Sequence, residues 1–336
     1  MSIVVTSINA PNNALRALAQ SALAAHMDFI VIGDTKSPLD FSLQGCRYFD
    51  IENQIATGLQ LATACPTRHY ARKNIGYLIA IRDGAQFIID TDDDNVPNAG
   101  FFASRQQHVS AAVVEKAGWV NVYRYFSDAN IWPRGFPLQA IRTMPPAFDE
   151  LRVRIVDCPI QQGLVDGDPD VDAIYRLCLP LPQNFRTDRR IALGMGAWCP
   201  FNSQNSTWWP QAFALLYLPA HCSFRMTDIW RSFVAYRIIV ENGWYLLFHE
   251  PTMWQDRNEH DLMRDFADEI PGYLNNDRIC RALEKTRLLG GSTNLVRDLR
   301  RCYETLVDIG VVDAKELTLV DAWIADLSSA QNHAHD

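Results

Sequence analysis

Residues 86–97 read QFIIDTDDDNVP. A short apolar run ends here in four carboxylates within five residues, Asp90 and Asp92–Asp94. Such a run predicts a buried central strand that delivers acidic side chains to the carboxyl edge of a sheet, where open α/β folds bind their ligands. Because clustered carboxylates repel one another, the cluster either binds a cation or is solvated by water.

The segments before this strand predict an α/β fold. Residues 3–8 and 29–32 are β-branched and apolar, as in buried strands, and the alanine- and leucine-rich residues 14–26 between them favour a helix. A second helix is predicted over 71–83, and Gly84 ends it just before the acidic strand. This β-α-β order predicts a mostly parallel central sheet flanked by helices, arranged as a nucleotide-binding sandwich.

The rest of the chain divides into a loop-rich region and a helical region. A helix is predicted over 101–118, and the Pro-, Gly- and aromatic-rich residues from there to about 210 read as binding loops for a second substrate. Thr227-Asp228 begins an amphipathic helix, and short helices prevail from about Asp265. We therefore predict an α/β domain over 1–265 and a C-terminal helical extension over 266–336.

Composition excludes several classes of protein. The 336 residues are 48% hydrophobic and 21% charged, as in a folded globule, and the net charge of −8 argues against general nucleic-acid binding. No apolar run approaches the roughly 18 residues of a membrane helix, and the N-terminus lacks a signal-peptide pattern. The eight cysteines are scattered without metal-type spacing. These features predict a soluble, cytoplasmic chain without an integral membrane segment.

Motif spacing limits the chemistry of the acidic cluster. An EF-hand loop starting at Asp90 would need Gly where Asn95 stands and Glu where Phe101 stands. The chain has no G-x-x-x-x-G-K-[ST], G-x-S-x-G or H-E-x-x-H motif. The remaining interpretation is an Asp-x-Asp cluster that holds Mg²⁺ or Mn²⁺ against a diphosphate, since these ions take one or two carboxylates and complete their shell with phosphate oxygens and water. Such a metal would act as a Lewis acid as a nucleoside diphosphate departs.

Two helix starts carry charged residues that each have two interpretations. Arg72 and Lys73 oppose the helix dipole, so they either bind a diphosphate or lie on a solvated surface. Asp228 either offsets a helix dipole or takes a proton from an acceptor as general base. Arg231, one turn later, either pairs with Asp228 or contacts a phosphate.

The residues in the loops on the second-substrate side also have two interpretations each. Trp132 and Arg134 either stack on and clamp a sugar or form rigid loop packing. Asn202 and Asn205 suit the recognition of hydroxyl groups, although hydrogen bonding within turns is the commoner use of asparagine.

Four blocks of the sequence resemble the STELLO family of glycosyltransferases. They are ARKNIGYL (71–78), DTDD (90–93), WPRG (132–135) and TDIWRSF (227–233). More distantly, VVTSI (4–8), DDD (92–94) and DIW (228–230) are similar to the reversibly glycosylated polypeptides, which are UDP-arabinopyranose mutases. The blocks keep the same order and span residues 3–270.

The STELLO resemblance implies a GT-A-like fold and transfer of a sugar from a nucleotide sugar, expected to be a UDP-sugar, to a carbohydrate or glycoconjugate acceptor. It implies Mn²⁺ or Mg²⁺ held by Asp92 and Asp94, with Asp228 and Arg231 catalytic. The implied donor site consists of Thr6, Asn9, Asp34, Lys36, Arg72, Lys73, Asn74, Asp90, Asp92 and Asp93. The implied acceptor side consists of Trp132, Arg134, Asn202 and Asn205.

The chain also departs from these families. STELLO-like sequences match Asp90, Asp92 and Asp93 but lack the third consecutive acid, so the metal-binding pair is left open. Many GT-A enzymes add a late histidine ligand, whereas residues 251–255 contain none, which leaves His249 or His260.

Two alternatives to a glycosyltransferase therefore remain. In a nucleotide-sugar mutase, Ile141 falls in the register of the glycosylated arginine and Arg142 is adjacent. The other alternative is a non-catalytic scaffolding protein with the same fold, and homo-oligomerisation is left open. STELLO-like proteins are membrane-anchored, and this chain is expected to correspond to their catalytic domain alone.

Overall fold

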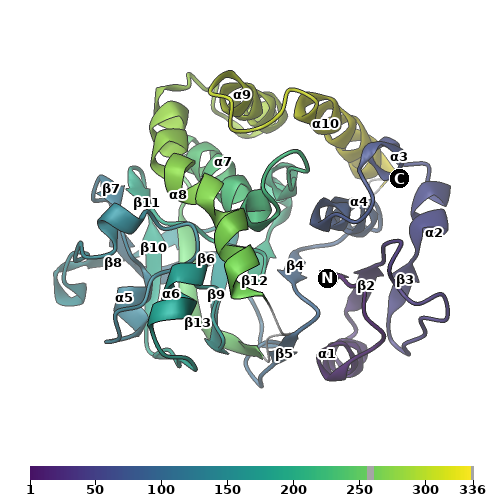
Figure 1. Cartoon of the computed structure of the whole chain (residues 1–336), viewed down its shortest axis with the longest axis horizontal. Helices are drawn as coiled ribbons and strands as arrows, with labels where there is room; N and C mark the ends of the chain where they lie inside the picture. The colour runs from purple at the N-terminus through teal and green to yellow at the C-terminus, as the bar shows by residue number, and fades with distance from the viewer. Residues whose placement is uncertain (256–260, 334–336) are drawn as a thin grey trace.

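The computed structural model describes residues 1–255 and 261–333 and is built on a large mixed β-sheet (Figure 1). Within those residues the sheet has eleven strands, in the order β3-β2-β1-β4-β12-β9-β13-β10-β6-β8, with β5 paired to β13. A separate two-stranded sheet joins β7 to β11. The strands are β1 Ser2–Thr6, β2 Asp28–Ile32, β3 Arg47–Phe49, β4 Ile88–Thr91, β5 Asn95–Pro97, β6 His108–Val114, β7 Gly118–Trp119, β8 Arg152–Asp157, β9 Ile160–Gly167, β10 Arg190–Leu193, β11 Ala197–Trp198, β12 Asn205–Trp208 and β13 Leu246–Gln255.

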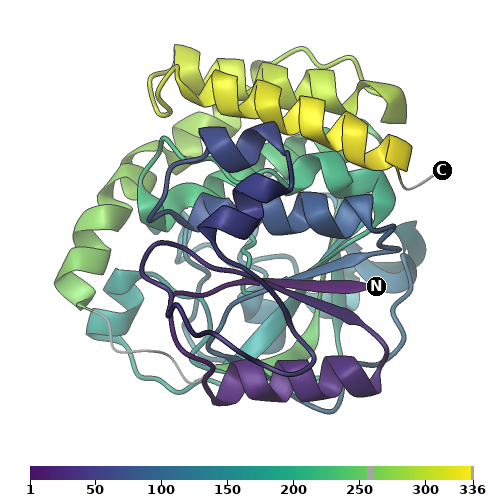
Figure 2. The same ribbon diagram turned by 90° about the vertical axis from the view of Figure 1, so that its right-hand side faces the viewer.

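Helices cover both faces of this sheet (Figure 2). The α-helices are α1 Asn13–Ala24, α2 Ile51–Ala56, α3 Gln60–Ala64, α4 Lys73–Arg82, α5 Tyr123–Phe126, α6 Ala173–Cys178, α7 Thr227–Glu241, α8 Leu262–Lys285, α9 Leu295–Asp308 and α10 Glu316–His333. The 3₁₀ helices are η1 Tyr70–Arg72, η2 Leu138–Ala140, η3 Phe148–Glu150, η4 Pro210–Leu216, η5 Phe224–Met226 and η6 Ser292–Asn294. Helix α1 lies below the sheet, α4 and α7 lie above it, and α9 and α10 form an outer layer over them.

Strands β1, β2 and β4 are buried on both faces, as is usual for parallel strands. Along β1, Ile3 and Val5 pack with α1, whereas Val4 packs on the opposite face with α4. Helix α4 approaches this face closely at Gly76, where a Cβ atom would lie 2.6 Å from Val4 Cγ1. The hydrophobic run therefore fixes the β1-β2-β4 part of the sheet between two helical layers.

The predicted α/β sandwich with C-terminal helices is confirmed, and its architecture is consistent with a GT-A-like fold. Strands β1, β2, β3 and β4 pair in parallel, as predicted. Farther along, the sheet is mixed: β12 runs antiparallel to both neighbours, and β13 runs parallel to β9 but antiparallel to β10. The mostly parallel description thus applies to the first half of the sheet.

The region that the sequence assigned to a helix and loops contains several of the other strands. Residues 108–114 form β6 and not part of a helix, because the backbone of HVSAAVV pairs with β8 on one side and with β10 on the other. Strand β9 carries buried glutamines whose amides bond backbone carbonyls, Gln161 to Gln106 at 2.8 Å and Gln162 to Asn205 at 3.1 Å. These satisfied amides allow a polar sequence to form a central strand.

The C-terminal helices pack directly onto the α/β part of the chain. The predicted boundary at 265/266 falls inside α8, and residues from both sides share one hydrophobic cluster. The buried Asp326 carboxylate in α10 accepts the backbone N–H groups of Gln60 and Leu61, at 2.9 and 2.8 Å, and so caps α3. Glu316 accepts the N–H of His221 at 2.7 Å. The helical extension is therefore part of the support of the main fold.

Candidate functional site

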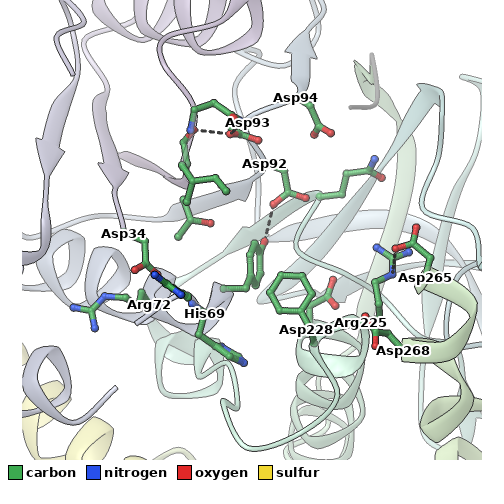
Figure 3. A pocket seen from close by; sticks show the side chains of 18 of the residues that line it. Asp34, His69, Arg72, Asp92, Asp93, Asp94, Arg225, Asp228, Asp265 and Asp268 are labelled. Carbon is green, nitrogen blue, oxygen red and sulfur yellow. Dashed lines mark hydrogen bonds and ion pairs between the residues drawn. The ribbon is translucent and has the colours of Figure 1, made fainter. Parts of the chain in front are cut away.

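A cleft of about 700 Å³ opens at the carboxyl ends of β1, β2 and β4 (Figure 3). One wall comes from the loops that follow these strands, and the other comes from the loop before α7 and the start of α8. The predicted site residues that line it are Thr6, Asn9, Asp34, Lys36, Arg72, Asp92, Asp93, Asp94, Arg134 and Asp228. The structure therefore brings these predicted residues together at one edge of the sheet.

Asp93 ties the acidic loop to the loop after β1. Its Oδ2 atom accepts hydrogen bonds from Ser7 Oγ at 2.5 Å and from Asn9 Nδ2 at 3.1 Å, and its backbone carbonyl accepts one from Asn12 Nδ2 at 2.7 Å. These bonds position the loop and occupy Oδ2 of the carboxylate. Asp93 and Asn9, both expected to bind the donor, thus hold the wall of the cleft in shape.

Asp92 presents a different arrangement. Both of its hydrogen bonds to described residues reach Oδ1, from Tyr70 at 2.6 Å and from Lys73 Nζ at 3.2 Å. Burial raises the pKa of this carboxyl to about 7, although Lys73 opposes the shift. The side chain keeps 29% of its surface exposed, so its second oxygen can meet a ligand in the cleft.

Asp92 and Asp94 fit a divalent cation through the chemistry of their oxygens. Both carboxyl groups point into the same part of the cleft in Figure 3, and Gln255 Nε2 holds Asp94 Oδ1 at 2.9 Å. No three carboxylate, imidazole or thiol groups are gathered into a metal-binding set in the part of the chain that the structure describes. Because Mg²⁺ and Mn²⁺ need only one or two carboxylates, this pair suits a cation that binds together with a diphosphate.

Beneath the cleft, Asp90 lies in a buried ion cluster and not in the donor site. Lys73 Nζ is 2.6 Å from Asp90 Oδ1, and Arg231 Nη1 is 2.9 Å from Asp90 Oδ2. Lys73 and Asp90 have no exposed side-chain surface, and Arg231 has 1%. The predictions that Lys73 and Asp90 contact the donor and that Arg231 is catalytic are corrected, because these charges neutralise one another inside the protein.

Asp228 lines the cleft but is paired with Arg134. Arg134 Nη2 lies 2.9 Å from Asp228 Oδ2, and the same guanidinium bonds Asp170 Oδ1 through Nε at 2.7 Å. Burial favours the neutral acid, yet Arg134 outweighs it and holds the pKa of Asp228 at about 2. A carboxylate with so low a pKa is a weak proton acceptor, so the structure disfavours Asp228 as a general base.

A chain of hydrogen bonds joins the two walls. The Tyr70 hydroxyl lies 2.6 Å from Ser203 Oγ, and the backbone N–H of Ser203 donates to Asp228 Oδ2 at 3.3 Å. Since Tyr70 also bonds Asp92, this hydroxyl connects the acidic loop to the paired charges of the opposite wall. Sequence reasoning missed Tyr70, although it directly precedes the ARKNIGYL block.

Three donor-side residues serve other purposes than expected. The Arg72 guanidinium is 2% exposed and bonds Gln54 Oε1 and two backbone carbonyls. Asn74 exchanges two hydrogen bonds of 2.8 Å with the backbone of Leu218. Asp34 accepts the N–H groups of Thr35 at 2.6 Å and His69 at 3.1 Å, and so orders the cleft wall.

Most of the expected acceptor residues are structural. Trp132 is 3% exposed and donates to Asp172 at 2.7 Å, beneath the cleft. Asn202 accepts the N–H of Gln204 at 3.0 Å within its own turn. Asn205 lies in β12, and its amide donates to Thr252 Oγ1 at 2.9 Å and to Leu164 O at 3.1 Å. The indole of Trp132 and the amides of Asn202 and Asn205 are therefore buried and hydrogen-bonded. Arg134 is the expected acceptor residue that lines the cleft.

Other cleft residues gave no signal in the sequence. Arg68 is exposed, has a left-handed backbone with φ of 58°, and forms no ion pair with any residue that the structure describes. The Phe224 ring is 53% exposed and meets His69 edge-on at 5.9 Å. Arg68 supplies positive charge to the cleft, and Phe224 supplies an aromatic face.

The remaining predicted residues lie elsewhere. His249 lines a second cavity, so it does not supply a third metal ligand at the cleft, and His260 lies outside the described residues. Ile141 and Arg142 are not among the residues that line the cleft, which disfavours the mutase interpretation. No helix in residues 1–255 or 261–333 has the length and apolar character needed to cross a membrane.

Fold and cleft together define an α/β protein with an open cleft at the carboxyl ends of its parallel strands. The model of the STELLO glycosyltransferases matches residues 225–333. Two proteins of Arabidopsis thaliana, probable glycosyltransferases STELLO2 and STELLO1, are each 27% identical over 97% of this chain. The chain is thus similar to the STELLO proteins, as its motifs predict, and spans 44% of the length of those relatives.

A likeness to a solved structure is more distant. The crystal structure of a mycobacterial protein is 10% identical, with a TM-score of 0.41 over 82% of this chain and 74% of the other.

Proposed function

We propose that this chain transfers a sugar from a nucleotide sugar, a UDP-sugar in the first instance, to a carbohydrate acceptor with the help of a divalent cation. The observation that carries the proposal is the setting of the Asp92 carboxylate. Tyr70 and Lys73 hold one of its oxygens, and the other has no hydrogen-bond partner among the described residues, at the strand end where α/β proteins bind ligands. The likeness to STELLO glycosyltransferases supports the choice of sugar transfer.

The cation would be held by Asp92 and Asp94. Lewis-acid neutralisation of the leaving diphosphate is the chemistry that bound Mn²⁺ or Mg²⁺ supplies in such a site. Tyr70 and Asp93 act as positioning residues, since one orients Asp92 and the other fastens its loop.

The donor diphosphate needs cations that are accessible. Arg72 and Lys73 are buried and already bonded, whereas Lys36 and Arg68 are exposed on the cleft wall and form no ion pair with described residues. We assign the diphosphate contact to Lys36 and Arg68. Arg68 is the stronger candidate because guanidinium groups bind phosphate oxygens in pairs.

The acceptor would enter beside Phe224. Its half-exposed ring can stack on the apolar face of a sugar, next to the Arg134–Asp228 pair. Because Arg134 keeps the pKa of Asp228 at about 2, the role proposed for Asp228 is to fix Arg134, not to accept a proton.

Thermal unfolding with a panel of nucleoside diphosphates, each with and without Mn²⁺, tests this proposal. A ligand at a hundred times its Kd adds about 2.7 kcal/mol of stability. We expect metal-dependent stabilisation by UDP that is lost in Asp92→Ala and kept in Asp128→Ala, a change at an 88% exposed aspartate outside the cleft lining. If no diphosphate stabilises the folded wild type, the donor site does not exist.

A further inference from the structure

A second cavity, of about 270 Å³, lies away from the cleft and shares no lining residue with it. It is bounded by the segment between β5 and β6, by β9, by the start of β10 and by the middle of β13. The lining residues are Gly100, Ala103, Ser104, Arg105, Gln106, Val109, Gln161, Arg190, Leu247, His249, Glu250 and Thr252.

Arg105 is the most unusual side chain in this cavity. Its guanidinium lies 5.1 Å from the ring centre of Phe101, and its Nε donates to Thr207 Oγ1 at 3.1 Å. Within the part of the chain that the structure describes, Arg105 has no ion pair and no hydrogen bond to a carboxylate. Burial lowers its pKa to about 10, which means that no nearby anion offsets the loss of water. A half-buried arginine without a counterion is costly to fold, and an anionic ligand would offset that cost.

The other charges of the cavity offset one another and leave the charge of Arg105 uncompensated. Arg190 Nη2 lies 3.6 Å from Glu250 Oε1, so the cavity has two arginines and one carboxylate. Burial lowers the pKa of His249 to about 4, with Glu250 opposing the shift and Arg105 adding to it. The imidazole is therefore neutral near pH 7, and the site carries an excess positive charge from Arg105.

The hydrogen bond of His249 sets which ring nitrogen can accept. Its Nδ1 atom lies 2.9 Å from the carbonyl oxygen of Glu250. Because a carbonyl only accepts, Nδ1 carries the proton and Nε2 of the neutral ring is an acceptor. An anion that also carries a hydroxyl, such as hydrogen phosphate, satisfies both the arginine and this nitrogen.

We propose that this second cavity binds a small phosphate, either inorganic phosphate or a phosphate monoester, through the guanidinium of Arg105. The planar fork of arginine matches two phosphate oxygens, and the charge-assisted bonds are strong. The volume falls just below the roughly 300–1,000 Å³ of sites for drug-sized ligands, as expected for a ligand of this size. The inference is independent of the proposed sugar transfer, because the two sites have no lining residue in common.

The cavity is connected to the cleft through β13. Thr252 lines the cavity and accepts a hydrogen bond from Asn205, while Gln255, three residues later, holds Asp94 in the cleft. The register of β13 against β9 shifts between His249 and Met253, beside the cavity. Strand β13 thus contributes residues to both the cavity and the cleft.

The test is calorimetric titration of the full chain with inorganic phosphate and, separately, with glucose 1-phosphate, in EDTA so that no cation recruits phosphate to the cleft. We expect saturable binding by the wild type and a loss of at least tenfold in affinity in Arg105→Gln. The matched control is Arg154→Gln, which removes an exposed arginine that pairs with Glu115 on another part of the surface. Arg68→Gln removes an exposed cation of the cleft and should leave this binding unchanged.

Two further results decide the outcome. Arg105→Gln should unfold at the same temperature as the wild type or higher without phosphate, because it removes an uncompensated charge, and phosphate should no longer stabilise it. Tighter binding of one of the two phosphates identifies the source of the ligand. Equal phosphate binding by wild type and Arg105→Gln, or no saturable binding by the folded wild type, would overturn the proposal.

Discussion

Asp90 and Asp92 stand two residues apart but in opposite electrostatic settings. Asp90 lies within β4, fully buried between Lys73 and Arg231, and its charge is balanced inside the protein. Asp92 lies just past the strand end, with one oxygen held and the other facing the cleft. The comparison teaches that the place of a carboxylate relative to the end of a strand, and not its membership of an acidic motif, decides whether it is buried in an ion cluster or accessible in the cleft.

The largest expected effect is on the buried member of this pair. Asp90→Ala leaves Arg231 buried without a carboxylate partner and Lys73 with Asp92 alone, and should lower the free energy of unfolding by about 3–5 kcal/mol. Asp92→Ala should change it by less than about 1 kcal/mol, because Asp92 is partly exposed. Urea denaturation of the two variants measures the difference. Similar losses in both would refute the distinction between the two settings.

Asp172 extends the comparison to a buried carboxylate whose hydrogen bonds come mainly from neutral donors. Burial raises its pKa from 3.8 to about 6, against the opposing bonds from Tyr175 and Trp132. The folded state therefore prefers the protonated acid, and this group lowers stability as pH rises from about 4 to about 6. The shift corresponds to about 3 kcal/mol. Wild-type stability relative to Asp172→Asn should fall by about this amount between pH 4 and pH 7, and an unchanged difference would contradict the assignment.

Glu316 tests whether the C-terminal helices support the cleft side of the molecule. Its buried carboxylate accepts the N–H groups of Ala220 and His221, in the segment leading to α7, and the hydroxyl of Tyr217. Glu316→Ala leaves these donors buried and unsatisfied, and should lower the free energy of unfolding by about 2–3 kcal/mol in a single transition. Separate unfolding of the C-terminal helices in calorimetry would show instead that they form an independent unit.

Tyr70 is expected to give the smallest effect on stability and an informative effect on binding. Tyr70→Phe removes the hydroxyl that orients Asp92, so stability should fall by about 1 kcal/mol. Mn²⁺ affinity in the presence of UDP should fall about tenfold, as for other groups that orient metal ligands. Tyr245→Phe, which removes a surface hydroxyl bonded to Glu115, is the control. Unchanged Mn²⁺ affinity in Tyr70→Phe would exclude the positioning role.

The sequence predicted the parallel part of the fold well because its signals there are local. The apolar run of β4 and the helix that precedes it follow from residue type and spacing alone. Strands β6 and β9 were missed since alanines in β6 favour a helix and glutamines in β9 look solvated. Their strand conformation depends on partners distant in the sequence.

The candidate site was predicted in position but only partly in detail. Lys73 and Asn74 were predicted to bind the donor because they belong to a sequence block that resembles the STELLO family. In the structure, Lys73 pairs with the buried Asp90, and Asn74 is hydrogen-bonded to the backbone of Leu218. Local sequence does not encode those distant partners. Arg68 and Tyr70 were overlooked for the same reason, because their position at the cleft depends on how η1 packs against β4 and the Ser203 turn.

The most direct test of the central claim is a titration of the full chain with Mn²⁺, followed by electron paramagnetic resonance, with and without saturating UDP. The account predicts one tightly bound Mn²⁺ that requires UDP, disappears in Asp92→Asn and persists in Asp128→Asn. Mn²⁺ binding by Asp92→Asn equal to that of the wild type, or no UDP-dependent Mn²⁺ binding by the folded wild type, would contradict it.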